Sequence, residues 1–198
     1  MRRQRNLLGP QGMGGMVGLW GASSLIKSVQ AATISIGVSA SSGTATIAQV
    51  DTSSTLLLPN GFSSGGADWV TNEVWPTFTL TNSTTITANK YTSSGTRFQN
   101  VLCTAVEFMP GIIKSIQYVQ WTYVGTTSGD TQAITAVNQN KSAIVQYGTR
   151  IAVAASQTRY AYSRIFFSTS SQLTVSAGTD PYGSGYDTVQ SVAVVEFF

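Results

Sequence analysis

An internal repeat constrains this chain more than any other feature of its sequence. Residues 26–30, Ile-Lys-Ser-Val-Gln, return 87 positions later as residues 113–117, Ile-Lys-Ser-Ile-Gln. Each motif begins a longer segment, and the two segments also end alike, with Val-Glu-Phe at 106–108 and again at 195–197. A repeat at this spacing indicates that one folding unit of roughly 85 residues was duplicated.

We call residues 26–108 the first repeat and residues 113–197 the second repeat. Short runs that alternate polar and apolar residues predict half-buried strands, and Gly, Asn, Asp, Ser and Pro clusters predict the turns between them. The sequence therefore predicts an all-β fold: two tandem β-sandwich repeats, jelly-roll-like, preceded by an extended N-terminal arm. In the first repeat the expected strands are 32–36, 44–50, 56–58, 74–80, 84–91 and 98–108.

Three segments follow from this division: an arm over 1–24, a first sandwich over 25–110 and a second over 111–198. Met109-Pro110-Gly111 links the repeats. Because this linker is short and Pro-Gly favours a turn, we expect the two repeats to touch.

The arm lies outside the repeat and is rich in glycine, so a helix is disfavoured there. We expect it to lie extended along a partner, with apolar anchors and with arginines that meet acidic groups. Two alternatives are that the arm folds back on its own body and that it is a signal peptide. The residues expected to bind the partner are Arg2, Arg3, Arg5, Leu7, Leu8, Met13, Met16 and Trp20.

Charge is scarce and unevenly placed. Charged residues make up 10% of the chain, and three of its eleven basic residues lie among the first five positions. The body is then neutral, with eight basic and eight acidic residues. A nucleic-acid-binding body would carry a basic patch, so no nucleic-acid partner is expected. No membrane partner is expected either, because the arm is too short and interrupted to span a bilayer.

The residue inventory is poor in catalytic chemistry. The chain has no histidine and one cysteine, Cys103. A serine triad of the familiar type, a disulfide framework and a Cys/His zinc site are therefore not expected. We interpret Cys103 as a small buried apolar residue. The sequence predicts no enzyme activity, no cofactor and no metal.

The glutamates and lysines that recur in both repeats can be assigned to one face of their strands. In the closing strands, a period of two places the flanking Val and Phe towards a core and Glu107 towards solvent or a neighbouring strand. Glu196 is expected to behave alike. Lys27 and Lys114 are interpreted as solvated or edge-protecting charges.

One loop of the second repeat, residues 178–187, combines carboxylates and tyrosines among glycines. Its aspartates could hold a hard cation, and its tyrosines could stack on a sugar ring or anchor a protein. The alternatives are a plain surface turn and packing of the tyrosines. The candidate contact residues are Asp180, Tyr182, Tyr186 and Asp187.

The repeated words resemble those of a known group. An Ile-Lys-Ser-Ile-Gln opening, a turn with Asp or Asn, a Thr-Asn-Ser-Thr-Thr-Ile-Thr-Ala stretch and a closing Val-Glu-Phe are similar to small structural proteins of tailed bacteriophage virions. The resemblance covers both repeats and not the arm. It implies a non-enzymatic virion component, in many copies, and no catalytic residues.

The residues and the resemblance together predict an accessory virion protein, decorating the capsid or belonging to the tail or fibre apparatus. Its partners would be capsid or tail proteins and further copies of itself, as in a trimer. The alternative is a receptor- or carbohydrate-binding module, in which second-repeat aromatic residues contact a host-surface glycan.

Overall fold

The computed structural model describes residues 25–37, 40–64, 76–90, 99–124, 129–151, 163–177 and 187–198. The predicted arm, residues 1–24, lies outside the described residues, as do positions 178–186 of the candidate loop.

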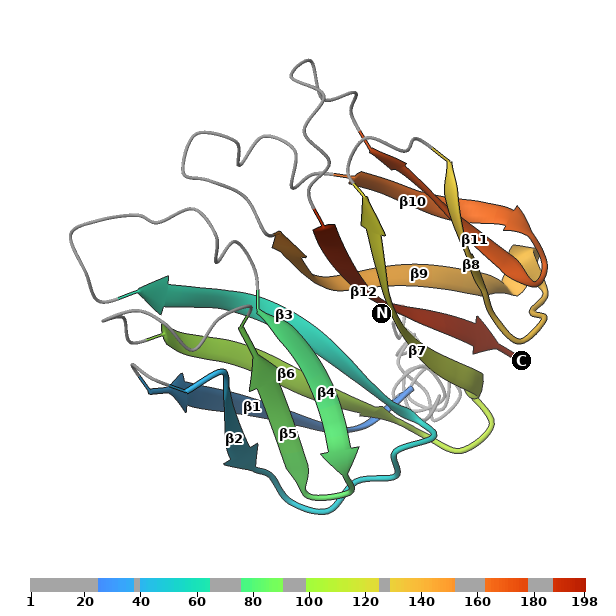
Figure 1. Cartoon of the computed structure of the whole chain (residues 1–198). Helices are drawn as coiled ribbons and strands as arrows, with labels where there is room; N and C mark the ends of the chain where they lie inside the picture. The colour runs from blue at the N-terminus through green and yellow to red at the C-terminus, as the bar shows by residue number, and fades with distance from the viewer. Residues whose placement is uncertain are drawn as a thin grey trace, which may run out of the picture.

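The described residues form twelve strands and one short 3-10 helix, which confirms the all-β prediction (Figure 1). No helix in these ranges is long and apolar enough to cross a bilayer. The strands are β1 (Ile26–Ile36), β2 (Ser42–Thr46), β3 (Thr55–Ser64), β4 (Thr77–Asn82), β5 (Thr85–Asn89), β6 (Gln99–Phe108), β7 (Ile113–Val124), β8 (Asp130–Ala133), β9 (Ser142–Ile151), β10 (Ser163–Thr169), β11 (Gln172–Ala177) and β12 (Asp187–Phe197), and the 3-10 helix is η1 (Gln139–Lys141).

Each repeat is a pair of three-stranded antiparallel sheets with the same topology. In the first repeat, sheet A has the order β1-β6-β3 and sheet B the order β2-β5-β4. In the second, sheet C has the order β7-β12-β9 and sheet D the order β10-β11-β8. The sandwich prediction is confirmed, with six described strands in each repeat where a jelly roll has eight.

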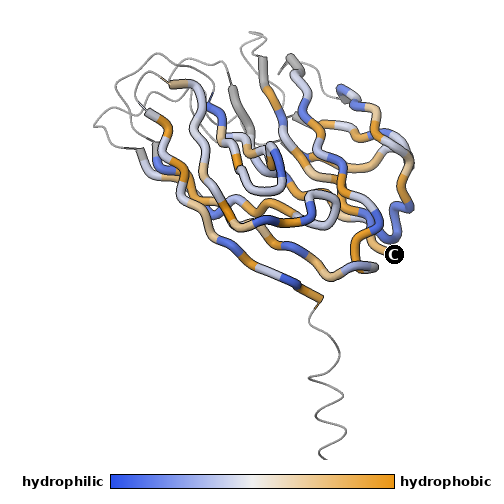
Figure 2. Tube along the Cα trace, turned by 90° about the horizontal axis from the view of Figure 1, so that it is seen from below, coloured by the Kyte–Doolittle hydropathy of each residue, from blue (hydrophilic) through white to orange (hydrophobic). Residues whose placement is uncertain are grey.

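Apolar and polar residues alternate along many of the strands, as Figure 2 shows. In β1 the alternation is regular, with Ala32, Ile34 and Ile36 buried and the residues between them exposed. This pattern is that of a sheet with one face on a core and one face outside. We call the face of sheet A that carries Val29, Ala31 and Thr33 its outer face.

The predicted end of the third strand at Pro59 was wrong. Strand β3 continues through Pro59, Asn60 and Gly61, and its register against β6 shifts there, as at a β-bulge. Proline is tolerated because β3 is an edge strand, and Gly61 takes a positive φ of 130° that disfavours other residues. Residues that are typical of a turn, Pro59-Asn60-Gly61, thus form a bulge inside a strand.

The repeats touch, as the short linker predicts. Residues 110–112 form a turn in which Gly111 has a φ of 83°. One core cluster joins apolar side chains of sheets A and B to Tyr147, Ala193 and Val195 of sheet C. The interface between the repeats is therefore part of the main core.

Strand β12 is buried on both faces. Val192 and Val194 pack in a second core with sheet D, whereas Ala193 and Val195 pack in the core shared with the first repeat. A strand covered on both sides needs a continuous apolar run, and residues 192–195, Val-Ala-Val-Val, supply it.

The two repeats meet through unlike surfaces. Strand β9 lies against β4 and β3, so the outer side of sheet C covers the β3–β4 side of the first sandwich (Figure 1). The Tyr118 hydroxyl donates to the Thr55 carbonyl at 2.5 Å, and Tyr118 stacks on Tyr147 with ring centroids 5.6 Å apart. A two-fold arrangement would place equal surfaces together, and this one does not.

Candidate functional site

A buried carboxylate joins three parts of the first repeat. Glu107 is 2% exposed and accepts hydrogen bonds from Lys27 Nζ at 2.7 Å and Ser28 Oγ at 3.0 Å. It also accepts from the backbone N–H of Asp51 at 2.9 Å. Strands β1 and β6 and the connection from β2 to β3 are thereby tied together. We call this cluster, Lys27, Ser28, Asp51 and Glu107, the carboxylate junction.

The second repeat contains the same junction. Glu196 accepts from Lys114 Nζ at 2.9 Å, from Ser115 Oγ at 3.5 Å and from the backbone N–H of Asn138 at 3.0 Å. Of the two predicted environments for Glu107 and Glu196, solvent was wrong and a neighbouring strand is confirmed, because each carboxylate is buried and bonded to side chains of the adjacent strand, β1 or β7. Both lie on the face of the strand that points between the sheets, because three donors replace the water that each carboxylate loses.

The lysines of the repeated motif are not merely solvated charges. Lys27 and Lys114 are half-exposed, at 51% and 53%, with their ammonium groups on the buried glutamates. The Gln of the motif has a role as well. The Gln30 amide donates to the Ala48 carbonyl and accepts from its N–H, at 3.2 and 2.7 Å. The repeated motif therefore supplies hydrogen bonds that hold the connection after β2 in place.

The amide bridge also recurs in the second repeat. Gln117 donates to the Thr135 carbonyl at 2.9 Å and accepts from its N–H at 2.7 Å. Each repeat thus keeps one bidentate amide bridge and one carboxylate junction.

The junctions lower the pKa of both glutamates. Burial by itself would raise the pKa of Glu107, but the bonds from Lys27, Asp51 N–H and Ser28 outweigh it, so the pKa lies below its ordinary value of 4.5. For Glu196 the backbone N–H of Asn138 is the largest cause of a lowered pKa, followed by Lys114.

This lowering predicts a loss of stability in acid. Because the folded-state pKa lies below the unfolded one, the unfolded chain binds more protons as the pH falls. The stabilisation is present above the ordinary value of 4.5 and is lost as the pH falls through the lowered values. Urea unfolding midpoints should fall between neutral pH and about pH 3. The double variant Glu107→Gln, Glu196→Gln should show a smaller fall, and an equal fall would contradict the assignment.

The predicted contact residues are mostly outside the described ranges. This holds for Arg2, Arg3, Arg5, Leu7, Leu8, Met13, Met16 and Trp20, and also for Asp180, Tyr182 and Tyr186. Asp187 is the first residue of β12. The structure thus does not bring the two predicted sets together or place either of them as a site.

Several second-repeat aromatic residues have packing roles instead. Trp121 and Tyr147 are buried, and Tyr118 is bound to Thr55 through its hydroxyl, whose burial raises its pKa to about 12. Their large rings fill the second core and the contact between the repeats.

The described residues also show no grouping suited to a metal. No three His, Cys, Asp or Glu side chains among them gather as a metal site needs. Cys103 is buried, as predicted, and burial raises the pKa of its thiol to about 12. A thiol of this kind is a poor nucleophile.

The outer face of sheet A carries a patch of exposed apolar side chains. Leu25 and Ile26 are 60% and 42% exposed at the start of β1, and Val29 and Leu102 are 60% and 43% exposed further along the sheet. Polar pairs lie around them, such as Ser35 with Asn100. Between Val29 and Leu102 lie Ala31 and Thr104, and Thr104 accepts a hydrogen bond from Asn60. We call Leu25, Ile26, Val29 and Leu102 the apolar patch.

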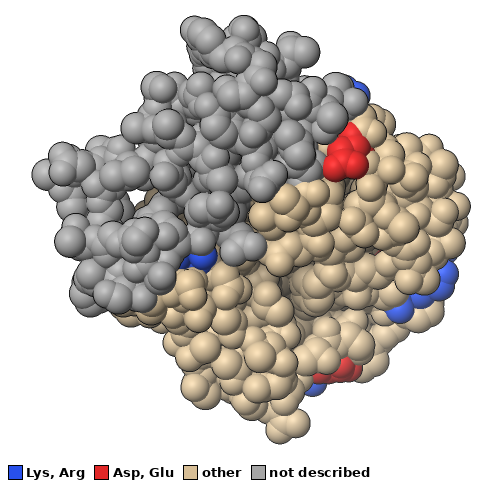
Figure 3. Space-filling model, viewed as in Figure 1, with Lys and Arg blue, Asp and Glu red and all other residues tan. Residues whose placement is uncertain are grey.

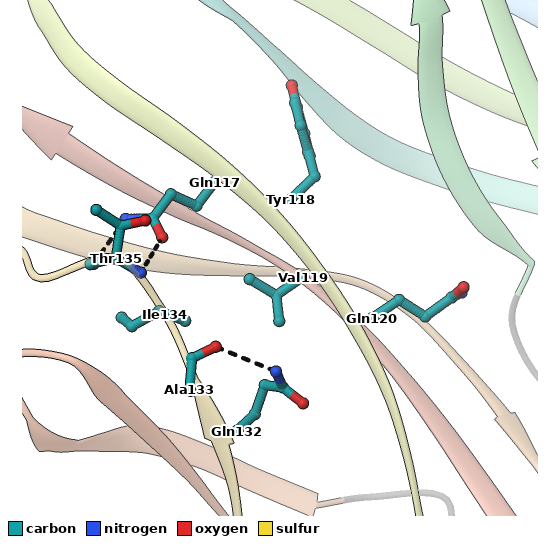
Figure 4. A pocket seen from close by; sticks show the side chains of 8 residues that line it. All are labelled: Gln117, Tyr118, Val119, Gln120, Gln132, Ala133, Ile134 and Thr135. Atoms are coloured by element: carbon teal, nitrogen blue, oxygen red, sulfur yellow. Dashed lines mark hydrogen bonds between the residues drawn. The ribbon is translucent and has the colours of Figure 1, made fainter.

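An open groove runs between β7 and β8 in the second repeat (Figure 4). Its volume is about 640 Å³, and it is lined by residues 117–120 and 132–135. The Gln117–Thr135 amide bridge lies at one end of it (Figure 4). Half-buried Val119 and Ile134 contribute apolar surface, and no lining residue is charged.

The corresponding strands of the first repeat, β1 and β2, are arranged differently. These strands lie close together, whereas β7 and β8 do not. Close approach is made possible by Gly43, where a Cβ would press on the Ser35 carbonyl oxygen. The position 87 residues later is Asp130, so the second repeat has a side chain where the first has none. Several residues that line the groove also differ from their first-repeat counterparts, such as Tyr118 from Ala31 and Gln132 from Ala45.

The charged groups on the described surface are isolated in the view of Figure 3, and most of that surface is uncharged. Neither the apolar patch nor the groove contains a charged residue. No protein-family model, no curated protein and no solved structure matches this chain.

Proposed function

We propose that this chain is a non-enzymatic structural protein of a tailed-phage virion, which assembles in several copies as part of the capsid surface or of the tail or fibre apparatus. The observation that carries the proposal is the apolar patch on the outer face of sheet A. Four of the large apolar side chains that are exposed in the described structure gather there, Leu25, Ile26, Val29 and Leu102. Leu25, Ile26 and Val29 lie towards one end of this face and Leu102 lies further along it. Several exposed large apolar side chains on one face of a folded protein typically mark a protein contact.

The contact between the repeats supports a partner that is another copy. Inside one chain, sheet C of the second repeat covers the β3–β4 side of the first repeat. Because unlike surfaces meet, the face of sheet A that corresponds to this face of sheet C is not the one used in the contact between the repeats. Interfaces of unlike surfaces generate rings or filaments when they recur between copies.

The counterpart surfaces differ in chemistry. Sheet A carries Ala31, Asn60 and Thr104 at the positions that correspond to Tyr118, Tyr147 and Ala193 in sheet C. A smaller and more polar face suits copies that must also be soluble before they assemble.

Quantitative mass spectrometry of gradient-purified virions, from the phage whose genome encodes the chain, tests the proposal. We expect the chain in several copies per particle, retained through the gradient. Its presence in the lysate and absence from the particles would contradict a structural role.

Charge placed in the apolar patch should weaken self-association. The double variant Val29→Glu, Leu102→Glu puts two carboxylates on exposed positions of the outer face, where they cost little in the isolated chain and much in a buried contact. Light scattering after size exclusion should show a shift from the assembly towards the 20.9 kDa monomer. Thr79→Glu, at an exposed position of β4, is the control and should leave the mass unchanged. Equal masses for the double variant and the control would exclude the patch as the contact.

A further inference from the structure

We infer that the groove between β7 and β8 receives part of the Gly-rich arm of a second copy, about four consecutive residues from within 9–21, as an added extended strand. The inference rests on the proposed assembly, because it needs a second copy. It goes further by naming a second contact and the segment that fills it.

The lining of the groove is that of a strand-binding site. Two runs of four consecutive residues line it, 117–120 on β7 and 132–135 on and after β8. Consecutive residues on one wall mean that the backbone itself forms the wall. Both β7 and β8 are edge strands in the described sheets, but on the β8 side the N–H and C=O of Thr135 are already bonded to Gln117. Strand β7 is therefore the wall whose outward N–H and C=O groups are offered to an extended segment.

The side chains of the groove favour an uncharged occupant. Gln117, Gln120 and Gln132 supply amides, and Val119 and Ile134 supply apolar surface. A charged segment would lose its water there without gaining an ion pair. Residues 6–26 of this chain contain no charged residue.

The composition of the arm also fits a narrow space between two strands. Its residues 12–21 include five glycines, and glycine allows another backbone to approach closely. Met13, Met16 and Leu19 lie between the glycines and can fill apolar surface beside Val119 and Ile134.

The position of the arm's end points to a second copy as its source. The arm, residues 1–24, joins the fold at Leu25, whose carbonyl accepts a hydrogen bond from the N–H of Met109 at 3.0 Å. Leu25 belongs to the apolar patch, so the arm leaves the fold at the surface proposed to meet a neighbouring copy. An arm that starts in this contact is placed to cross to the neighbour.

Cysteine cross-linking tests the inference, because the native Cys103 is buried and unreactive. One full-length chain carries Gln132→Cys in the groove. A second, tagged chain carries Met13→Cys, Met16→Cys or Leu19→Cys in the arm, so that one unsuitable register does not decide the result. The matched control is Ala45→Cys, the position of the first repeat that corresponds to Gln132 and is equally half-buried.

We expect mixed chains to form a disulfide-linked heterodimer with Gln132→Cys and not with Ala45→Cys, and an excess of a synthetic peptide of residues 9–21 to abolish it. Equal cross-linking with the control, or none in chains that do assemble, would overturn the inference and leave the proposed assembly standing. Cross-linking only within one chain, seen in a double variant at low concentration, would overturn the second copy as source. A chain that stays monomeric at every concentration would overturn both.

Discussion

Gly148→Ala is expected to lower the free energy of unfolding by about 3 kcal/mol, the upper part of the range for overpacked cores. Gly148 lies in β9 at the contact between the repeats, and a Cβ there would press on the carbonyl oxygen of Pro76. A backbone atom cannot move aside as the end of a flexible side chain can. The strain therefore falls on the packing of the second repeat against β4.

Urea unfolding of the full chain measures this change. Gly37→Ala is the matched control, because the added Cβ would meet only the Ala40 Cβ at 3.9 Å, in ordinary contact. The control should be neutral or slightly stabilising, since alanine restricts the unfolded chain. Equal midpoints for the two variants would show that the repeats do not pack tightly at Gly148.

Glu107→Ala should cost a similar amount, about 3 kcal/mol. The substitution removes the acceptor for the backbone N–H of Asp51 and the partner of Lys27, and it leaves a space beneath β1. Lys27→Ala should cost less than about 1 kcal/mol, because the lysine is half-exposed and its removal leaves two donors on the carboxylate.

The comparison of these two variants separates the stability that the buried Glu107 acceptor contributes from the stability that the surface ion pair with Lys27 contributes. Thermal or urea unfolding of both at neutral pH gives the answer. A Lys27→Ala variant as unstable as Glu107→Ala would mean that the ion pair, and not the backbone acceptor, stabilises the junction.

The fold class could be predicted because its signals are local. Alternation in β1 and the spacing of the repeated words required no knowledge of tertiary contacts. The Pro59 turn was misread because the same residues make a turn or an edge bulge, and only the pairing with β6 decides between them.

The carboxylate junctions were also missed, although the sequence contained a signal for them. Lys, Ser and Gln recur with Glu in both repeats while most other positions differ, which is unusual for solvated charges. Period-two reasoning correctly separates Glu107 from its neighbours but cannot say which face lies between the sheets. Here the glutamate side faces inwards, where the Asp51 N–H and Lys27 compensate for its burial.

The candidate surfaces were beyond sequence reasoning for a different reason. The apolar patch depends on which face of sheet A is left uncovered after the repeats pack. The groove depends on the separation of β7 and β8. The sequence indicates this separation only indirectly, through Asp130 at the position that Gly43 occupies in the first repeat.

The most direct test of assembly through these surfaces is the mass of the full-length protein in solution, measured by light scattering over a wide range of concentrations. Assembly through the apolar patch predicts a defined multiple of 20.9 kDa that the Val29→Glu, Leu102→Glu variant loses. A 20.9 kDa monomer at every concentration would contradict it.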